Sequence, residues 1–156
     1  MREMEMATLE YYFEDFAVGD TFDLGEYTFN ADEIVRFARQ FDPQPFHVDE
    51  GAGRDSHFGG LVASGWHTCS IMMRLNVDKL LSRAASMGSP GVEQIEWLKP
   101  VRPGDTITVT SSTLEVRASK SRPDRGIVRQ LWTATNQHGE EVCRFRGTGL
   151  YLKRPT

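Results

Sequence analysis

Apolar side chains recur at three- and four-residue intervals in an early segment of the chain, at Ile34, Val35, Phe37, Ala38 and Phe41. This period predicts an amphipathic helix over residues 31–41. Asn30 precedes the segment and can cap the helix, while the Glu33 side chain can bond back to the backbone N–H of that cap. Pro43 and Pro45 then end the helix, because proline removes a backbone donor and disfavours a helical conformation in the residue before it.

A second segment of helical character covers residues 66–86, and its apolar side chains occupy most sides rather than one stripe. A helix that is apolar nearly all round is typically buried, so we expect it to lie in the core. Ser64 precedes this helix and is a suitable N-cap. Residues 43–63 separate the two helices without a regular period, and an irregular segment of that length in a small domain is usually functional.

Residues typical of β-structure dominate five further segments, which we predict to be strands: 21–29, 92–98, 105–116, 127–136 and 141–152. Glycine, proline, asparagine and aspartate mark turns between the last four of them. Short connections between long strands indicate antiparallel pairing. The pattern therefore predicts the α+β class, with one buried helix packed against a curved antiparallel sheet.

The composition is that of an ordinary globular protein, with 39% hydrophobic and 26% charged residues in a chain of 156. This length and the lack of internal repeats predict one domain over residues 1–156. The net charge of −4 argues against a nucleic-acid or anionic-membrane partner, since either favours a basic protein. No apolar run approaches the ~18–20 residues that span a bilayer, and residues 1–10 lack the apolar stretch of a signal peptide, so we expect a cytoplasmic protein.

The two cysteines, Cys69 and Cys143, are too few for a disulfide framework and lack the spacing of a metal site. Cys69 lies on the apolar helix and is interpreted as a small buried hydrophobic residue. Basic residues gather between residues 117 and 129. They could contact the phosphates of a nucleotide-bearing substrate, but a solvated hairpin tip is the favoured interpretation.

Candidate chemistry is concentrated in the segment that contains Asp42 and His47. Pro43 and Pro45 lie between these two residues and fix their own backbone φ angles, so the carboxylate and the imidazole have little freedom relative to each other. Two titratable groups held in this way can converge on one water or one substrate proton, as general acid–base catalysis requires. A helix end followed by a histidine with local hydrogen bonds is an equally good interpretation of the spacing alone.

Gly65 opens the second helix and is the other candidate for chemistry. The first N–H groups of a helix have no partner within the helix, and the helix dipole favours negative charge there. Such a site suits a developing oxyanion, for example an enolate formed from a thioester. For the glycine taken alone, close packing against a neighbouring strand is the favoured interpretation, and for the Ser64 hydroxyl simple capping is preferred.

Together these segments resemble the MaoC-like dehydratases, the (R)-specific enoyl-CoA hydratases of the hot-dog fold. The residues that match the family pattern are Asp42, Pro45, His47, Phe58-Gly59 and Gly65. The opening Tyr12–Phe16 and the Trp97–Asp105 segment are also similar to the family, so that the resemblance extends over most of residues 11–152.

The resemblance implies a hot-dog fold, in which an antiparallel sheet wraps around the central helix and two subunits pair as a homodimer or a dimer of dimers. It also implies a reaction on an acyl-CoA or acyl-carrier thioester. Asp42 and His47 would activate a water that adds to C3 of a 2-enoyl group, or remove it in the reverse direction. The N–H of Gly65, beside Ser64, would bind the thioester oxygen, and no metal or other cofactor is required.

Two departures from the family pattern leave the acyl group open. Gln44 stands where the family often has asparagine, and Ser64 stands where a histidine often precedes the helix glycine. Two other functions compete with the hydratase. A hot-dog acyl-CoA thioesterase would need an acidic base near the start of the central helix, which offers only the distant Asp78. A non-catalytic acyl-CoA-binding module would give no reason for the Asp42/His47 pair.

Overall fold

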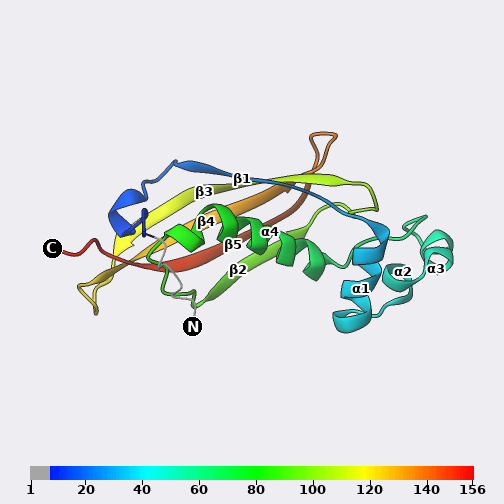
Figure 1. Ribbon diagram of the computed structural model, residues 1–156, viewed down its shortest axis with the longest axis horizontal. Coiled ribbons are helices and arrows are strands. Elements are labelled where there is room, and N and C mark those ends of the chain that lie inside the picture. The colour runs from blue at the N-terminus through cyan, green and yellow to red at the C-terminus, as the bar shows by residue number, and fades with distance from the viewer. Residues whose placement is uncertain (1–7) are drawn as a thin grey trace, which may run out of the picture.

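The computed structural model describes residues 8–156, and a five-stranded antiparallel sheet of order β1-β3-β4-β5-β2 forms its framework (Figure 1). The strands are β1 (Thr21–Thr28), β2 (Gly91–Trp97), β3 (Thr106–Ala118), β4 (Arg125–Thr135) and β5 (Glu141–Leu152). All five predicted strands are confirmed, with ends that differ from the prediction by no more than two residues. The antiparallel pairing of β3 with β4 and of β4 with β5 through short turns is confirmed as well.

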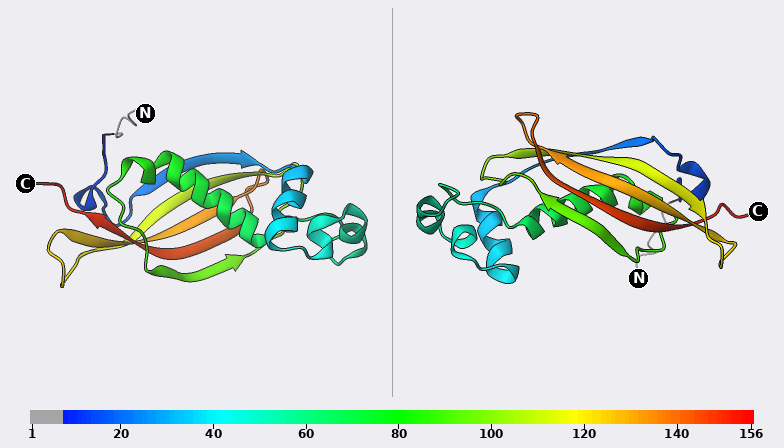
Figure 2. Two further views of the ribbon diagram at one scale, coloured as in Figure 1. Left: turned by 60° about the horizontal axis from the view of Figure 1, so that its bottom comes forward. Right: turned by 180° about the vertical axis from the view of Figure 1, so that it is seen from behind.

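The central helix α4 (Gly65–Lys79) lies across the concave face of this sheet (Figure 2). Its Met72 side chain is fully buried and packs with the inward side chains of the strands, among them Val109 and Val128. These inward residues alternate with outward ones along β3 and β4, as expected of a sheet with one buried face. The α+β class and the helix-on-sheet arrangement are therefore confirmed.

The prediction for this helix was wrong in two respects. It ends at Lys79 rather than near residue 86, because Leu80 leaves the helical conformation and turns a fully buried side chain into the core. A short 3₁₀ turn, η2 (Leu81–Arg83), follows. The helix is also not buried all round, since Trp66, Met73 and Val77 remain 54%, 46% and 38% exposed along one stripe.

The first helix, α1 (Ala31–Phe41), is confirmed with its predicted bounds. The Asn30 side chain accepts a hydrogen bond from the backbone N–H of Glu33 at 2.9 Å, as a cap should. The second half of the predicted capping arrangement is wrong, because the Glu33 carboxylate accepts instead from the Tyr27 hydroxyl on the adjoining strand. Burial of the phenol, and next this hydrogen bond, raise the pKa of Tyr27 to about 12.

The segment between α1 and α4 is more regular than its sequence pattern predicts. It holds two short helices, α2 (Pro45–Val48) and α3 (Glu50–Asp55), and these lie with α1 beyond one end of the sheet (Figure 1). Gly53 packs against the backbone of residues 60–61, where a Cβ would come within 2.7 Å of main-chain atoms. Only glycine permits this approach, which folds the segment back toward the start of α4.

In residues 8–156, no helix is both long enough and apolar enough to cross a membrane. The expectation that residues 1–10 hold no signal peptide concerns a segment of which residues 1–7 lie outside the described part of the chain.

Candidate active site

The structure brings Asp42 and His47 together, with 3.3 Å between the Asp42 Oδ2 and His47 Nε2 atoms. Asp42 caps the C-terminus of α1, where its N–H donates to the Ala38 carbonyl at 2.8 Å. Pro45 then begins the single turn of α2 that carries His47. The helix end and the proline-restrained start of α2 thus fix the two side chains relative to each other.

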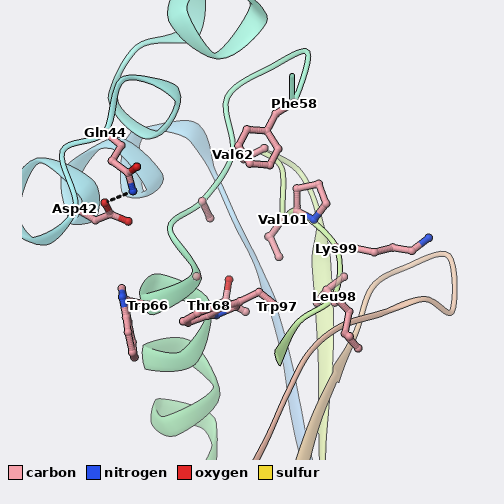
Figure 3. Close-up of a pocket in the computed structure, with 14 residues that line it drawn as sticks. Asp42, Gln44, Phe58, Val62, Trp66, Thr68, Trp97, Leu98, Lys99 and Val101 are labelled. Carbon is pink, nitrogen blue, oxygen red and sulfur yellow. Dashed lines mark hydrogen bonds between the residues drawn. The ribbon is translucent and has the colours of Figure 1, made fainter. Parts of the chain in front are cut away.

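Three neighbours stabilise the Asp42 carboxylate. The Ser64 hydroxyl donates to Oδ2 at 2.7 Å. The Gln44 side-chain amide donates to Oδ1 at 2.8 Å (Figure 3). Burial by itself raises the pKa of Asp42, but the two hydrogen bonds and the nearby His47 ring outweigh it and lower the pKa below its usual range. Asp42 is therefore held as an acceptor, ready to orient a water or to take part in proton transfer.

His47 has a fixed ring orientation. Its Nδ1 lies 2.6 Å from the carbonyl oxygen of Val62, and because a carbonyl can only accept, Nδ1 carries a hydrogen. Nε2 is thus the ring nitrogen free to exchange a proton, and it faces Asp42. The His47 side chain is 8% exposed and that of Asp42 is 18% exposed, so Asp42 is the member of the pair that reaches the solvent side.

The start of α4 lies beside this pair. Ser64 caps the helix by accepting from the backbone N–H of Trp66 at 3.3 Å, which confirms the predicted cap. Its hydroxyl is fully buried and donates to Asp42, so one side chain joins the helix start to the carboxylate. Gly65 is the first helical residue, and its N–H has no acceptor within the helix.

A cavity of about 480 Å³ lies in front of Asp42 and Gly65 (Figure 3). Gln44 and Phe58 border it near the pair, whereas Ser64 and His47 are not among the residues that line it. The opposite wall is formed by the segment that ends β2 and follows it: Trp97, Leu98, Lys99, Pro100 and Val101. The cavity is thus an apolar space with a carboxylate and a helix N-terminus on one side.

Both interpretations of Gly65 are compatible with its surroundings. The glycine packs closely, since a Cβ there would lie 2.4 Å from the indole nitrogen of Trp97. It also borders the cavity, so its N–H is near the space that a ligand would occupy. Trp97 packs edge-on against Trp66 as well, with ring centroids 5.1 Å apart. Trp97 and the residues after it were missed as site candidates, although the aromatic and proline pattern of this segment already contributed to the family resemblance.

The other sequence candidates lie apart from the site. The basic cluster sits on the β3–β4 hairpin at the end of the sheet opposite α1, α2 and α3 (Figure 1), so it is far from the cavity. Cys69 lies on α4 next to Cys143, with the two sulfur atoms 3.9 Å apart. Within residues 8–156, no group of three or more histidine, cysteine, aspartate or glutamate side chains is arranged to hold a metal ion.

Ser64→Ala is expected to raise the pKa of Asp42, because burial remains while the strongest hydrogen bond to the carboxylate is lost. A carboxylate whose pKa is lowered by folding contributes stability at neutral pH that is lost as the pH falls from its unfolded-state pKa through its folded-state pKa, so the variant should lose less stability over this acid range than the wild type. The free energy of unfolding at pH 7 should fall by about 1–2 kcal/mol. Urea unfolding across a pH series measures both effects.

Asn30→Ala is the matched control, because it removes the cap of α1 without touching Asp42. It should lower the free energy of unfolding by about 1 kcal/mol at every pH, and leave the decrease of that free energy at acid pH unchanged. A Ser64→Ala profile that parallels the control would contradict the role of Ser64 in setting the charge of Asp42.

Comparison with known proteins places the chain in a family. The model of the MaoC like domain matches residues 15–136, which include both members of the pair and the start of α4. The chain belongs to the MaoC-like domain family. A MaoC-like dehydratase from Rhodospirillum rubrum has a crystal structure that is 46% identical, with a TM-score of 0.89 over 94% of this chain and 100% of that one.

More distant relatives agree with this assignment. The uncharacterized protein YdeM of Bacillus subtilis is 29% identical over 90% of this chain and 98% of its own length. An R-hydratase from Pseudomonas aeruginosa is 18% identical and shares the fold, with a TM-score of 0.75 over 94% of this chain and 89% of that one. The fold is the hot-dog fold. A Mycobacterium tuberculosis protein with a double hot-dog fold matches with a TM-score of 0.78 over 92% of this chain and 44% of that one. The predicted family and fold are thereby confirmed.

Proposed function

We propose that this MaoC-like protein is a hydratase/dehydratase of 2-enoyl and 3-hydroxyacyl thioesters. The observation that carries the proposal is the 3.3 Å approach of Asp42 Oδ2 to His47 Nε2 beside a cavity that also borders the N-terminal residue of α4. Acid–base groups and an amide donor on one cavity are what addition of water to an enoyl thioester needs. The R-hydratases among the structural relatives support the same chemistry.

In the proposed mechanism, Asp42 and His47 Nε2 hold one water and accept its proton as the oxygen bonds to C3. The C2–C3 double-bond electrons move toward the thioester, whose oxygen becomes an enolate. The N–H of Gly65 binds this oxygen, and the pair returns the proton to C2, which leaves a 3-hydroxyacyl thioester. The reverse sequence is a dehydration. The thioester itself acidifies C2, so we propose that no metal or other cofactor takes part.

We propose an acyl-CoA, or an acyl-carrier thioester, as the substrate. The cavity offers aromatic and aliphatic walls for the acyl group, including Phe58, Trp97 and Leu98. Lys99 lies at the cavity and pairs with Glu140 near its outer edge, where a charged carrier would approach. Neither nucleic acid nor a membrane is proposed as a partner, and we place the protein in the cytoplasm as one domain over residues 1–156.

The thioesterase alternative finds less support. It would direct a water at the thioester carbon with an acidic base near the start of α4, but the only carboxylate of that helix is Asp78. Thirteen residues at 1.5 Å each separate it from Gly65, about 20 Å along the axis. Asp78 is moreover paired with Arg74 at 2.9 Å on the exposed side. A non-catalytic acyl-CoA-binding module would leave the arrangement of Asp42 and His47 without a purpose.

Loss of enoyl-thioester absorbance on mixing the purified protein with crotonyl-CoA tests the proposal. The proposed function requires turnover with formation of 3-hydroxybutyryl-CoA, identified by chromatography against both enantiomers. Release of free CoA thiol in place of hydration would favour the thioesterase. Absence of turnover with chains from four to twelve carbons, combined with thermal stabilisation by the same thioesters, would favour the binding module.

We further propose that the protein is a homodimer, or a dimer of dimers, built on the open edge of β2. That strand is last in the sheet, and β5 is its one neighbour among the described strands. Val92 and Trp97 on β2 are about half exposed, and the exposed stripe of α4 at Trp66 and Met73 also bears apolar side chains. Pairing two such edges buries these side chains and completes the hydrogen bonding of β2.

Val92→Lys is expected to weaken the dimer at least tenfold, because the two-fold axis would bring two lysines to one apolar edge. Light scattering during size-exclusion chromatography over a concentration series measures the change. Val18→Lys is the control, since Val18 is 66% exposed in a loop before β1 and away from this edge. Equal behaviour of the two variants would contradict the β2 edge as the interface.

A further inference from the structure

The two cysteines of the chain meet although they lie far apart in the sequence. Cys69 is on the second turn of α4, and Cys143 is near the start of β5. Their sulfur atoms are 3.9 Å apart, and both are free thiols. A disulfide bond is about 2.05 Å long, so a closure of roughly 2 Å between the sulfurs would join them.

The surroundings give the two sulfurs different roles. Cys143 is fully buried, whereas Cys69 is partly exposed. A hydrogen bond between the two thiols lowers the pKa of Cys69 against the opposing effect of burial, because the Cys69 thiolate can accept from the Cys143 thiol, and the Trp97 indole adds to this lowering. The same bond and burial raise the pKa of Cys143. Cys69 is thus the more reactive thiol and Cys143 the one that keeps its proton.

We propose that Cys69 and Cys143 are an oxidation site for hydroperoxides, which convert the pair into an intramolecular disulfide. The Cys69 thiolate attacks one peroxide oxygen, the O–O bond breaks, and the sulfur becomes a sulfenic acid while the other oxygen leaves as hydroxide. The Cys143 sulfur then displaces the sulfenic hydroxyl, which takes the Cys143 proton and leaves as water. The sulfurs lose two electrons in total and the peroxide gains them.

The pair is located where such a bond changes the cavity. Cys69 follows Gly65 by one helical turn, and Cys143 is the cross-strand partner of Trp97 in the β2–β5 ladder. Trp97 in turn packs against Gly65. A disulfide therefore draws the start of α4 and the Trp97 wall toward each other. For its effect on turnover, the inference rests on the proposed hydratase function.

Mass spectrometry of the reduced, full-length protein after treatment with hydrogen peroxide tests the chemistry independently of any activity. The inference predicts loss of two hydrogen atoms from the intact chain, a non-reduced peptide that joins Cys69 to Cys143, and reversal by dithiothreitol. Cys143→Ser should instead gain one oxygen at Cys69, and Cys69→Ser should react much more slowly. Cross-links between chains, or stepwise oxygen gain in the wild type without an internal link, would overturn the proposal.

Turnover of crotonyl-CoA by the same samples tests the consequence. The oxidised wild type should lose activity by about tenfold or more and recover it on reduction, because a misplacement of about 1 Å at the site can cost up to about 10²-fold. Peroxide-treated Cys143→Ser, which cannot form the link, should keep most of its activity. Equal losses in both proteins would overturn the coupling. An inactive reduced wild type would refute the hydratase function but leave the mass result valid.

Discussion

Asp42→Asn should reduce hydration of an enoyl-CoA by about 10²–10⁴-fold, which is the range expected when a positioned acid–base group is lost. The amide has nearly the same shape as the carboxylate, but it carries no negative charge and can accept a proton only poorly. Ser64 can still bond to it by reversing the direction of its hydrogen bond. Stability should therefore change far less than turnover.

Asp49→Asn is the matched control for this variant. Asp49 is exposed and caps α3 by accepting from the N–H of Ala52, a role that asparagine also fills. The two variants should have similar melting temperatures and differ in turnover.

His47→Gln should show a loss of turnover comparable to that of Asp42→Asn, because the two side chains act on one proton. His57→Gln, on an exposed loop, should keep its turnover and serves as the control. Full activity in either Asp42→Asn or His47→Gln would remove that residue from the mechanism.

Gly65→Ala should reduce kcat/KM by at least about tenfold, with a cost in stability of no more than about 1–3 kcal/mol from the crowded Trp97 ring. Alanine is a better helix former than glycine, so the first turn of α4 is not weakened. The new Cβ, however, would lie 2.4 Å from the Trp97 indole nitrogen, and the ring must move. Because Trp97 and Gly65 both line the cavity, the displaced indole changes the space in which the thioester oxygen would meet the Gly65 N–H.

A second substitution separates this explanation from a direct effect on α4. Trp97→Ala removes the ring that the alanine would strike, so the Gly65→Ala/Trp97→Ala pair should recover activity relative to Gly65→Ala alone. The double-mutant cycle on kcat/KM measures the coupling between the two positions. Additive effects would contradict the contact between them as the cause of the loss.

The local part of the site was predictable from the sequence because its causes are local. The end of α1 before Pro43 and the start of a new helical turn at Pro45 follow from the restraints of proline. These two features limit how the Asp42 and His47 side chains can lie relative to each other. The N-cap of α4 at Ser64 follows from residue type in the same way. Each of these features depends on no more than six consecutive residues.

The features that were not predictable depend on tertiary contacts. The bond from Ser64 to Asp42 joins residues 22 positions apart, and the cavity wall at residues 97–101 comes from the end of β2 and the loop after it, far from α1 and the start of α4 in the sequence. The end of α4 at Lys79 likewise depends on the burial of Leu80 in the core, which no local pattern announces. The exposed stripe of α4 shows the same limit, since a helix apolar on most sides cannot reveal which side faces the sheet.

The measurement that tests the central claim most directly is the fate of oxygen from labelled water. The protein is incubated with crotonyl-CoA in oxygen-18 water, and the products are analysed by mass spectrometry. A water activated by Asp42 and His47 and added at C3 predicts label in the 3-hydroxyl group of an intact 3-hydroxybutyryl-CoA, formed about 10²–10⁴-fold more slowly by the Asp42→Asn variant. Label in the carboxylate of a free acid, with release of CoA, would contradict the account.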